Sequence, residues 1–222
     1  MDASEPVVSV VIPALNEAAY LPRTLSTLGR QDGGVPFEAF VVDGGSTDGT
    51  REIAREFGVT LIEAPGTGIG EARHVGAEHA SGDWLAFVDA DTKVRDRYLA
   101  EMLAVVRERN LAAASSRCRV IDAYRGKAKQ AVVNHVFPSL PRPVLPGFNF
   151  FIDANVYAQT GGFPDVPNED TAYSRRLART YNTGYHPEVL VETSGRRFGD
   201  DGLTGALYHY LRLDAGRVRS PY

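Results

Sequence analysis

The chain has 222 residues, of which 43% are hydrophobic and 23% charged, a composition typical of a soluble globular protein. Its formal net charge of −4 and pI near 5.8 argue against a nucleic-acid partner. The one cysteine, Cys118, excludes an intramolecular disulfide and a cysteine-rich zinc site, and we expect it to be a small buried hydrophobic residue.

The N-terminus, MDASEP, lacks the basic and apolar regions of a signal peptide. No apolar run approaches the ~20 residues that a membrane-spanning helix needs. We therefore expect a cytoplasmic protein, with peripheral contact with a membrane as an open alternative.

The first half of the chain alternates strand-like and helix-like segments. Strands are predicted at residues 7–12, 37–42, 59–62 and 84–88, and helices after each of them. Pro13 is expected to end the first strand, and Asn16 to cap the first helix, in which Leu21, Leu25 and Leu28 have helical spacing. This alternation predicts an α/β fold with a mostly parallel sheet, in which ligands bind beyond the carboxyl ends of the strands.

The second half is less regular. It predicts strands at 112–121, 148–152 and 189–191, a proline-rich loop at 138–146 and a turn at 161–164. Helices are expected at 124–137, from Glu169 with Asn168 as its cap, and at 203–213. The change near residue 110 predicts a functional division within one domain.

Two carboxylates directly follow the fourth predicted strand. In extended backbone, residues two apart point the same way, so Asp89 and Asp91 could converge on Mg²⁺ or Mn²⁺, or one could take a ribose hydroxyl. The alternative is a solvated turn, where Asp is common. Their position at the end of a strand favours function.

The turns after the second and third strands are rich in glycine. Residues 43–50 read DGGSTDGT, which allows close approach of a ligand, although a plain strand-to-helix turn explains the pattern equally well. Residues 66–70, GTGIG, match neither the dinucleotide fingerprint nor the P-loop. Arg73, one turn into the next helix, could meet a diphosphate or lie on the surface.

Two charged pairs lie in the second half. Glu169 and Asp170 begin a helix whose dipole stabilises carboxylates, and either a charged first turn or a general base explains them. Arg196 and Arg197 suit a diphosphate, with a solvated basic loop as the alternative.

Together these segments resemble the family 2 glycosyltransferases with the GT-A fold, over about residues 7–200. The segments similar to the family's motifs are VVIPALNE at 10–17, VVDGGSTDGT at 41–50, GIG at 68–70 followed by Ala72-Arg73, ASGD at 80–83, the D-x-D motif Asp89-Ala90-Asp91, and GGF at 161–163 followed by Glu169-Asp170. The chain departs from the family at His74, where Asn is common, and at 194–198, SGRRF, which looks like a shortened S-x-R-R-W element.

The resemblance implies one GT-A domain over residues 1–222, with the nucleotide-sugar half at about 1–110 and the acceptor half at about 111–222. It implies sugar transfer from a nucleotide-diphosphate donor to an acceptor hydroxyl or lipid phosphate, on a glycan or lipid-linked acceptor. Mn²⁺ or Mg²⁺ would bind Asp91, Asp170 would be the general base, and the reaction would invert the anomeric centre. The implied donor-binding residues are Pro13, Ala14, Asn16, Glu17, Asp43, Gly44, Ser46, Gly68, Arg73, Asp89, Ala90 and Asp91, and those near the diphosphate or acceptor are Glu169, Arg196 and Arg197.

Two other functions stay open. A nucleotidylyltransferase is expected to carry a glycine-rich loop with a basic residue after its first strand, where this chain has PALNE at 13–17. A catalytically inactive binding module of the same fold is disfavoured by the intact Asp89, Asp91 and Asp170.

Overall fold

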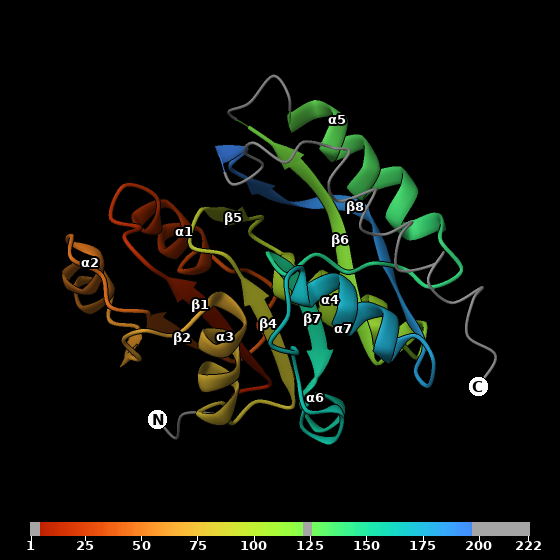
Figure 1. Cartoon of the computed structure of the whole chain (residues 1–222), viewed down its shortest axis with the longest axis horizontal. Coiled ribbons are helices and arrows are strands. Elements are labelled where there is room, and N and C mark those ends of the chain that lie inside the picture. The colour runs from red at the N-terminus through yellow and green to blue at the C-terminus, as the bar shows by residue number, and fades with distance from the viewer. Residues whose placement is uncertain (1–4, 122–125, 197–222) are drawn as a thin grey trace.

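The computed structural model describes residues 5–121 and 126–196, and its centre is an eight-stranded sheet with helices on both faces (Figure 1). The strand order is β3-β2-β1-β4-β7-β6-β8-β5. The strands are β1 (Val8–Ala14), β2 (Phe37–Asp43), β3 (Thr60–Glu63), β4 (Trp84–Val88), β5 (Thr92–Val94), β6 (Ala113–Val120), β7 (Asn149–Asp153) and β8 (Thr183–Thr193). The helices are α1 (Leu21–Leu28), α2 (Thr50–Glu56), α3 (Ile69–Glu78), α4 (Tyr98–Glu108), α5 (Gly126–Ala131), α6 (Ala154–Thr160) and α7 (Glu169–Leu177).

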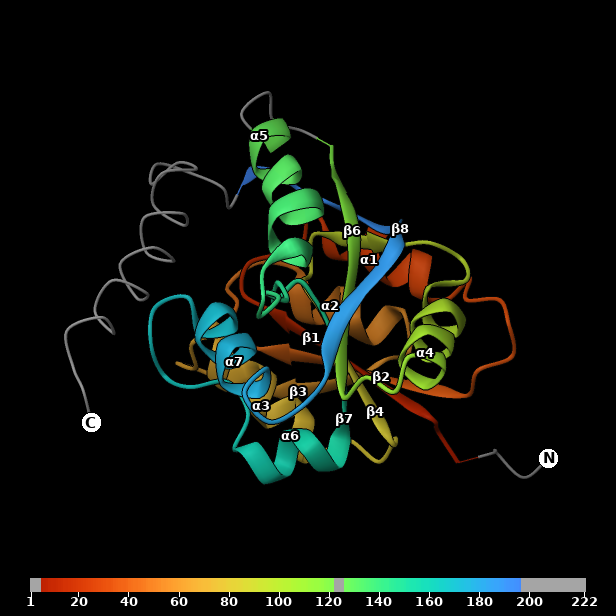
Figure 2. The same cartoon turned by 90° about the vertical axis from the view of Figure 1, so that its right-hand side faces the viewer.

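The sheet is parallel in the first half of the chain and mixed in the second. Strands β3, β2, β1 and β4 run parallel, as predicted, whereas β7 is antiparallel to both β4 and β6. The long strands β6 and β8 lie side by side and parallel (Figure 2). Strand β5 pairs with β8 in the antiparallel sense. The predicted α/β class with a mostly parallel sheet is therefore confirmed.

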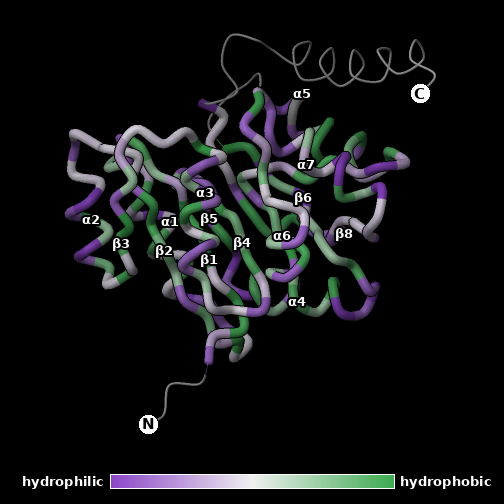
Figure 3. Tube along the Cα trace, turned by 60° about the horizontal axis from the view of Figure 1, so that its bottom comes forward, coloured by the Kyte–Doolittle hydropathy of each residue, from purple (hydrophilic) through white to green (hydrophobic). Residues whose placement is uncertain are grey.

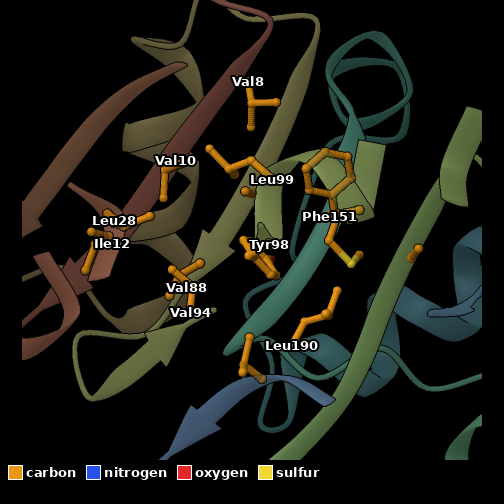
Figure 4. Close-up of a cluster of buried hydrophobic side chains, with 14 of the residues drawn as sticks. Val8, Val10, Ile12, Leu28, Val88, Val94, Tyr98, Leu99, Phe151 and Leu190 are labelled. Carbon is orange, nitrogen blue, oxygen red and sulfur yellow. The ribbon is translucent and has the colours of Figure 1, made fainter. Parts of the chain in front are cut away.

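Strand β1 is buried on both sides because its neighbours cover both edges and helices cover both faces. Val8, Val10 and Ile12 pack into one core with residues of α1 and α4, while Val11 packs into the other core with Ala72 of α3. The two directions follow from the two-residue period of a strand. Figure 4 shows the first core, and Figure 3 shows hydrophobic residues along β1, β2 and β4 and hydrophilic ones over α2.

The second core contains a cluster of aromatic rings that holds the segment 161–169 onto the sheet. Phe163 lies 5.2 Å from Phe87 of β4 and 5.2 Å from Phe150 of β7, between ring centroids. Tyr173 of α7 stacks on Phe150 at 5.6 Å. The start of α7 is thereby fixed relative to the end of β4.

Two sequence predictions at the end of β1 are wrong. Pro13 does not end the strand, which continues to Ala14. Proline has no N–H to donate, but it is tolerated here because the pairing of β1 with β4 stops at Val11. Asn16 does not cap α1, which begins at Leu21 after Tyr20. Asn16 instead has a φ of 55° and bonds to the next loop.

Several other elements differ from the prediction in extent. Strand β8 has eleven residues where 189–191 was expected, and β5 and α6 were not predicted. The helix expected at 124–137 continues from α5 as a π-helix (Val132–Val136) and a 3₁₀ turn (Phe137–Ser139). The helix expected at 203–213 lies outside the described residues. Asn168 precedes α7 but makes no side-chain capping bond.

In the part of the chain that the structure describes, no helix is both long enough and apolar enough to cross a membrane. Cys118 is buried, as predicted, and burial raises the pKa of its thiol to about 12.

Candidate active site

The loops after β1 and β2 are bonded to each other at the carboxyl edge of the sheet. Asn16 N donates to Ser46 Oγ at 2.9 Å, and Thr47 N donates to Asn16 Oδ1 at 2.9 Å. Glu17 N donates to Thr50 Oγ1 at 2.8 Å. Asn16 and Ser46, both predicted to touch a donor, therefore shape the two loops.

Asp43 is the last residue of β2, and its carboxylate organises the glycine-rich turn that follows. Its oxygens accept from Gly45 N at 3.2 Å and from Ser46 N at 3.1 Å. Gly45 has a φ of 103°, which residues with a side chain rarely adopt. The glycine allows the turn to wrap around the buried carboxylate.

A cavity of about 390 Å³ opens beside these loops. It collects six of the residues predicted to bind the donor or its diphosphate: Pro13, Ala14, Glu17, Gly44, Gly68 and Arg196. It is also lined by four residues that were not predicted: Leu15, Thr67, Ile69 and Ala72. Leu15 is 52% exposed. Its place directly after the first predicted strand, where ligands bind in such sheets, is the sequence signal that could have found it.

Asp91 and Glu17 converge on the guanidinium of Arg196. Arg196 Nε donates to Asp91 Oδ2 at 2.9 Å, and its NH2 group donates to Glu17 Oε2. The guanidinium carbon also lies 4.2 Å from the centre of the Tyr20 ring, in cation–π contact. Partial burial lowers the pKa of Arg196, but the hydrogen bonds and charges of the two carboxylates outweigh it and raise that pKa.

This pair has the chemistry of a hard-cation site. Carboxylate oxygens are the ligands that Mg²⁺ and Mn²⁺ prefer, and here two of them already meet one positive group. No cluster of three or more His, Cys, Asp or Glu side chains suited to a metal occurs among residues 5–121 and 126–196. The protein would therefore supply few ligands itself.

Arg73 lies at the centre of a second ionic group. Its NH2 donates to Asp89 Oδ1 at 2.9 Å and its NH1 to Glu169 Oε1 at 2.6 Å. Its side chain is only 2% exposed, so it does not lie on the surface. Burial lowers its pKa, but the nearby charges of Asp89, Glu169 and Asp170 outweigh that effect and raise the pKa.

The backbone of Gly147 links Arg73 to Asp170. A Cβ at position 147 would lie 2.6 Å from an Arg73 nitrogen, so any residue other than glycine there would displace the guanidinium. Gly147 N donates to Asp170 Oδ2 at 2.9 Å, and Thr171 N donates to Asp170 Oδ1 at 2.6 Å. Arg73, Gly147 and the start of α7 thus form one packed unit.

A second cavity, of about 480 Å³, adjoins the first at Gly68 and Ile69, which line both. Its other side is formed by residues of the segment 161–169, including Glu169, and the carboxylate of the next residue, Asp170, accepts from Gly147 N. Residues from both halves of the chain therefore line the two adjoining cavities.

One predicted residue, Ala90, lies elsewhere. The side chain of Ala90 is in the hydrophobic core, and its carbonyl oxygen accepts from Thr24 Oγ1 at 2.7 Å, because alternate residues after β4 face opposite ways. Arg197 lies outside the described residues. The ring of Tyr20 beside Arg196 had no signal in the sequence.

The family model for glycosyl transferase family 2 matches residues 9–187 of this chain, which include both cavities except Arg196. The chain belongs to glycosyl transferase family 2. It is thus a glycosyltransferase, which sets aside the nucleotidylyltransferase and the inactive module.

Curated relatives agree. The chain is 27% identical over 236 residues to glycosyltransferase AglE of Haloferax volcanii, covering 99% of this chain and 75% of that protein. It is 41% identical over 107 residues to a PGL/p-HBAD biosynthesis glycosyltransferase of Mycobacterium bovis, covering 46% of this chain and 40% of that protein. The match thus spans three quarters of the first relative and less than half of the second.

Solved structures show the same fold. The mannosyltransferase PcManGT from Pyrobaculum calidifontis, in complex with GDP-Man and Mn²⁺, has a TM-score of 0.73 at 21% identity, covering 98% of this chain and 66% of that one. TarS 1–349 of S. aureus, in complex with UDP-GlcNAc, has a TM-score of 0.70 at 19% identity, and the match covers 84% of this chain and 58% of that one. This glycosyltransferase therefore has the GT-A fold.

Proposed function

We propose that this glycosyltransferase moves a sugar from a nucleoside-diphosphate donor in the first cavity to an acceptor in the second. The observation that carries the proposal is the 390 Å³ cavity at the carboxyl ends of β1 and β2, with two buried carboxylates meeting a cation at its margin. PcManGT was solved with GDP-Man and Mn²⁺ and TarS with UDP-GlcNAc, which supports a donor of this class.

In this proposal Asp91 holds a divalent cation, Mn²⁺ or Mg²⁺, with Glu17 beside it. The ion would supply charge neutralisation for the diphosphate leaving group. Asp89, which accepts from Arg73 on the same edge of the sheet, is the proposed contact of a ribose hydroxyl. Because no group of three or more suitable side chains occurs among the described residues, the donor would have to help hold the ion.

Asp170 is the proposed general base. An acceptor hydroxyl loses its proton as its oxygen attacks the anomeric carbon, and the bond to the diphosphate breaks on the opposite face, which inverts that carbon. The backbone N–H groups of Gly147 and Thr171 hold the carboxylate in place. Asp170 directly follows Glu169, which lines the second cavity, and this closeness in the chain to the proposed acceptor cavity supports the role. The acceptor is a glycan hydroxyl or a lipid phosphate, and a phosphate would need no such base.

The test measures release of nucleoside diphosphate from UDP- and GDP-sugars, with and without Mn²⁺, for wild type and Asp170→Asn. We expect release by Asp170→Asn to fall at least about 100-fold, the usual contribution of a general base. The rise in melting temperature that the donor causes should survive, because the asparagine leaves the donor cavity intact.

Two variants make the result specific. Glu169→Gln removes the charge of the neighbouring carboxylate, which already bonds to Arg73, and should lose less activity than Asp170→Asn. Asp32→Asn changes an exposed residue that follows α1 at the far end of the sheet and should behave as wild type. Turnover retained in Asp170→Asn, or lost only in Glu169→Gln, would reject Asp170 as the base.

A further inference from the structure

The two arginines of the site differ in how easily they could leave their carboxylates. Arg73 is 2% exposed and lies against Gly147 and Phe163, so its guanidinium is almost entirely shielded from water. The side chain of Arg196 is 32% exposed, although Glu17 and Asp91, its partners, are each only 2% exposed. Because the guanidinium of Arg196 is already partly hydrated, breaking its bonds to the carboxylates should cost less free energy than breaking those of Arg73.

Arg196 occupies the two carboxylates that a metal at Asp91 would meet. Its guanidinium bonds to both Asp91 and Glu17, which are buried in a region of low dielectric. A divalent cation would neutralise both carboxylates. Arg196 also lines the donor cavity, so it lies where an arriving diphosphate would offer its guanidinium a new anionic partner.

We propose that Arg196 is the resident counter-cation of Asp91 and Glu17, and that it competes with the divalent metal for this position. In the donor-free enzyme Arg196 holds the carboxylates and keeps the metal affinity low. When donor and metal arrive together, the guanidinium transfers to the diphosphate and the metal takes its place at Asp91. This inference rests on the proposed function, because it assumes that Asp91 is the metal ligand.

The experiment titrates Mn²⁺ alone into the donor-free protein and follows free Mn²⁺ by electron paramagnetic resonance. We expect Arg196→Gln to bind Mn²⁺ about tenfold more tightly than wild type, the gain if Arg196 occupies the site in roughly nine molecules of ten. Arg196→Lys should fall between them, because an ammonium keeps the charge but cannot bond to both carboxylates in the same fork.

Arg30→Gln is the matched control, since Arg30 pairs with Asp96 on the exposed end of α1 outside the site, and it should bind Mn²⁺ as wild type does. A thermal melt gives a second readout. Without Mn²⁺, Arg196→Gln should melt below wild type, because Asp91 and Glu17 lose their bonds to the guanidinium of Arg196. Mn²⁺ should raise the melting temperature of Arg196→Gln more than that of wild type.

The outcomes separate the two proposals. If wild type binds Mn²⁺ through Asp91, so that Asp91→Asn abolishes binding, but Arg196→Gln binds no more tightly, the competition is overturned and the metal site stands. If neither wild type nor Arg196→Gln binds Mn²⁺ in a way that Asp91→Asn weakens, both the competition and the metal role of Asp91 fail.

Discussion

At the scale of single residues, Arg73 is the charge on which the site depends. Its buried guanidinium joins Asp89, after β4, to Glu169, at the start of α7, which are 80 residues apart in the sequence. Removing one partner of a buried ionic group leaves the others uncompensated in a low dielectric. The residue predicted to meet the diphosphate is thus first a structural tie between the two halves of the site.

We therefore expect Arg73→Met to lower the free energy of unfolding by about 3–5 kcal/mol, as measured by urea denaturation. Arg55 offers a matched control, because it too lies between two carboxylates, Glu52 and Glu63, but its side chain is 55% exposed and both partners are exposed. Arg55→Met should cost less than about 1 kcal/mol, since water screens exposed pairs. Equal losses in the two variants would contradict the role of burial.

At the scale of elements, the turn between β2 and α2 is built around its acidic residues. Asp48 accepts from Thr50 N at 3.0 Å and from Ala18 N at 3.1 Å, so it joins the start of α2 to the loop after β1. Its slight burial raises its pKa, but the hydrogen bonds from Thr50 and Ala18 outweigh this and lower the pKa below 3.8. The ionised form is therefore the one that stabilises the turn.

Asp48→Ala should lower the free energy of unfolding by about 0.5–1 kcal/mol at pH 7. Because the folded pKa lies below the unfolded value of 3.8, this stabilisation is complete above pH 3.8 and is lost as the pH falls through the folded pKa. In thermal melts at pH 7, 5 and 3, the difference in melting temperature between Asp48→Ala and wild type should shrink only at pH 3. Glu56 is exposed on the same helix, and the melting temperature of Glu56→Ala should differ from wild type by the same amount at each pH. A difference between Asp48→Ala and wild type that does not change with pH would contradict the mechanism.

At the scale of the whole molecule, β7 joins the two halves of the sheet. It pairs with β4 of the first half and with β6 of the second, and its Phe150 lies at the centre of the aromatic core. The rings of Phe87 and Tyr173 touch Phe150 from both halves of the chain. The two halves of the chain thereby share one hydrophobic core.

Phe150→Ala should lower the free energy of unfolding by about 3–5 kcal/mol, because it opens a cavity that fixed rings cannot fill. Denaturation followed by circular dichroism and by Trp84 fluorescence should give one coincident transition. Phe57→Ala, at a ring that is 43% exposed, should cost far less. Two separate transitions would show that the halves unfold independently.

Local patterns predicted the first half of the fold well. The runs of β-branched and aromatic residues that became β1, β2 and β4 bury both faces, and the 3.6-residue spacing of Leu21, Leu25 and Leu28 marks one side of α1. The second half was less predictable because β7 is antiparallel within a sheet whose earlier strands are parallel. Nothing local distinguishes the two kinds of strand when both are buried.

Patterns along the chain were sufficient for the α/β class and the family, because polar motifs directly follow buried strands whose ends share one edge. The partners of the polar side chains became clear from the folded structure alone. Asn16 ties loops instead of capping a helix, Arg73 is buried between carboxylates, and Arg196 bonds to Glu17 across 179 residues. Such contacts depend on where distant segments meet and on how much water they exclude, and neither follows from the spacing of residues along the chain.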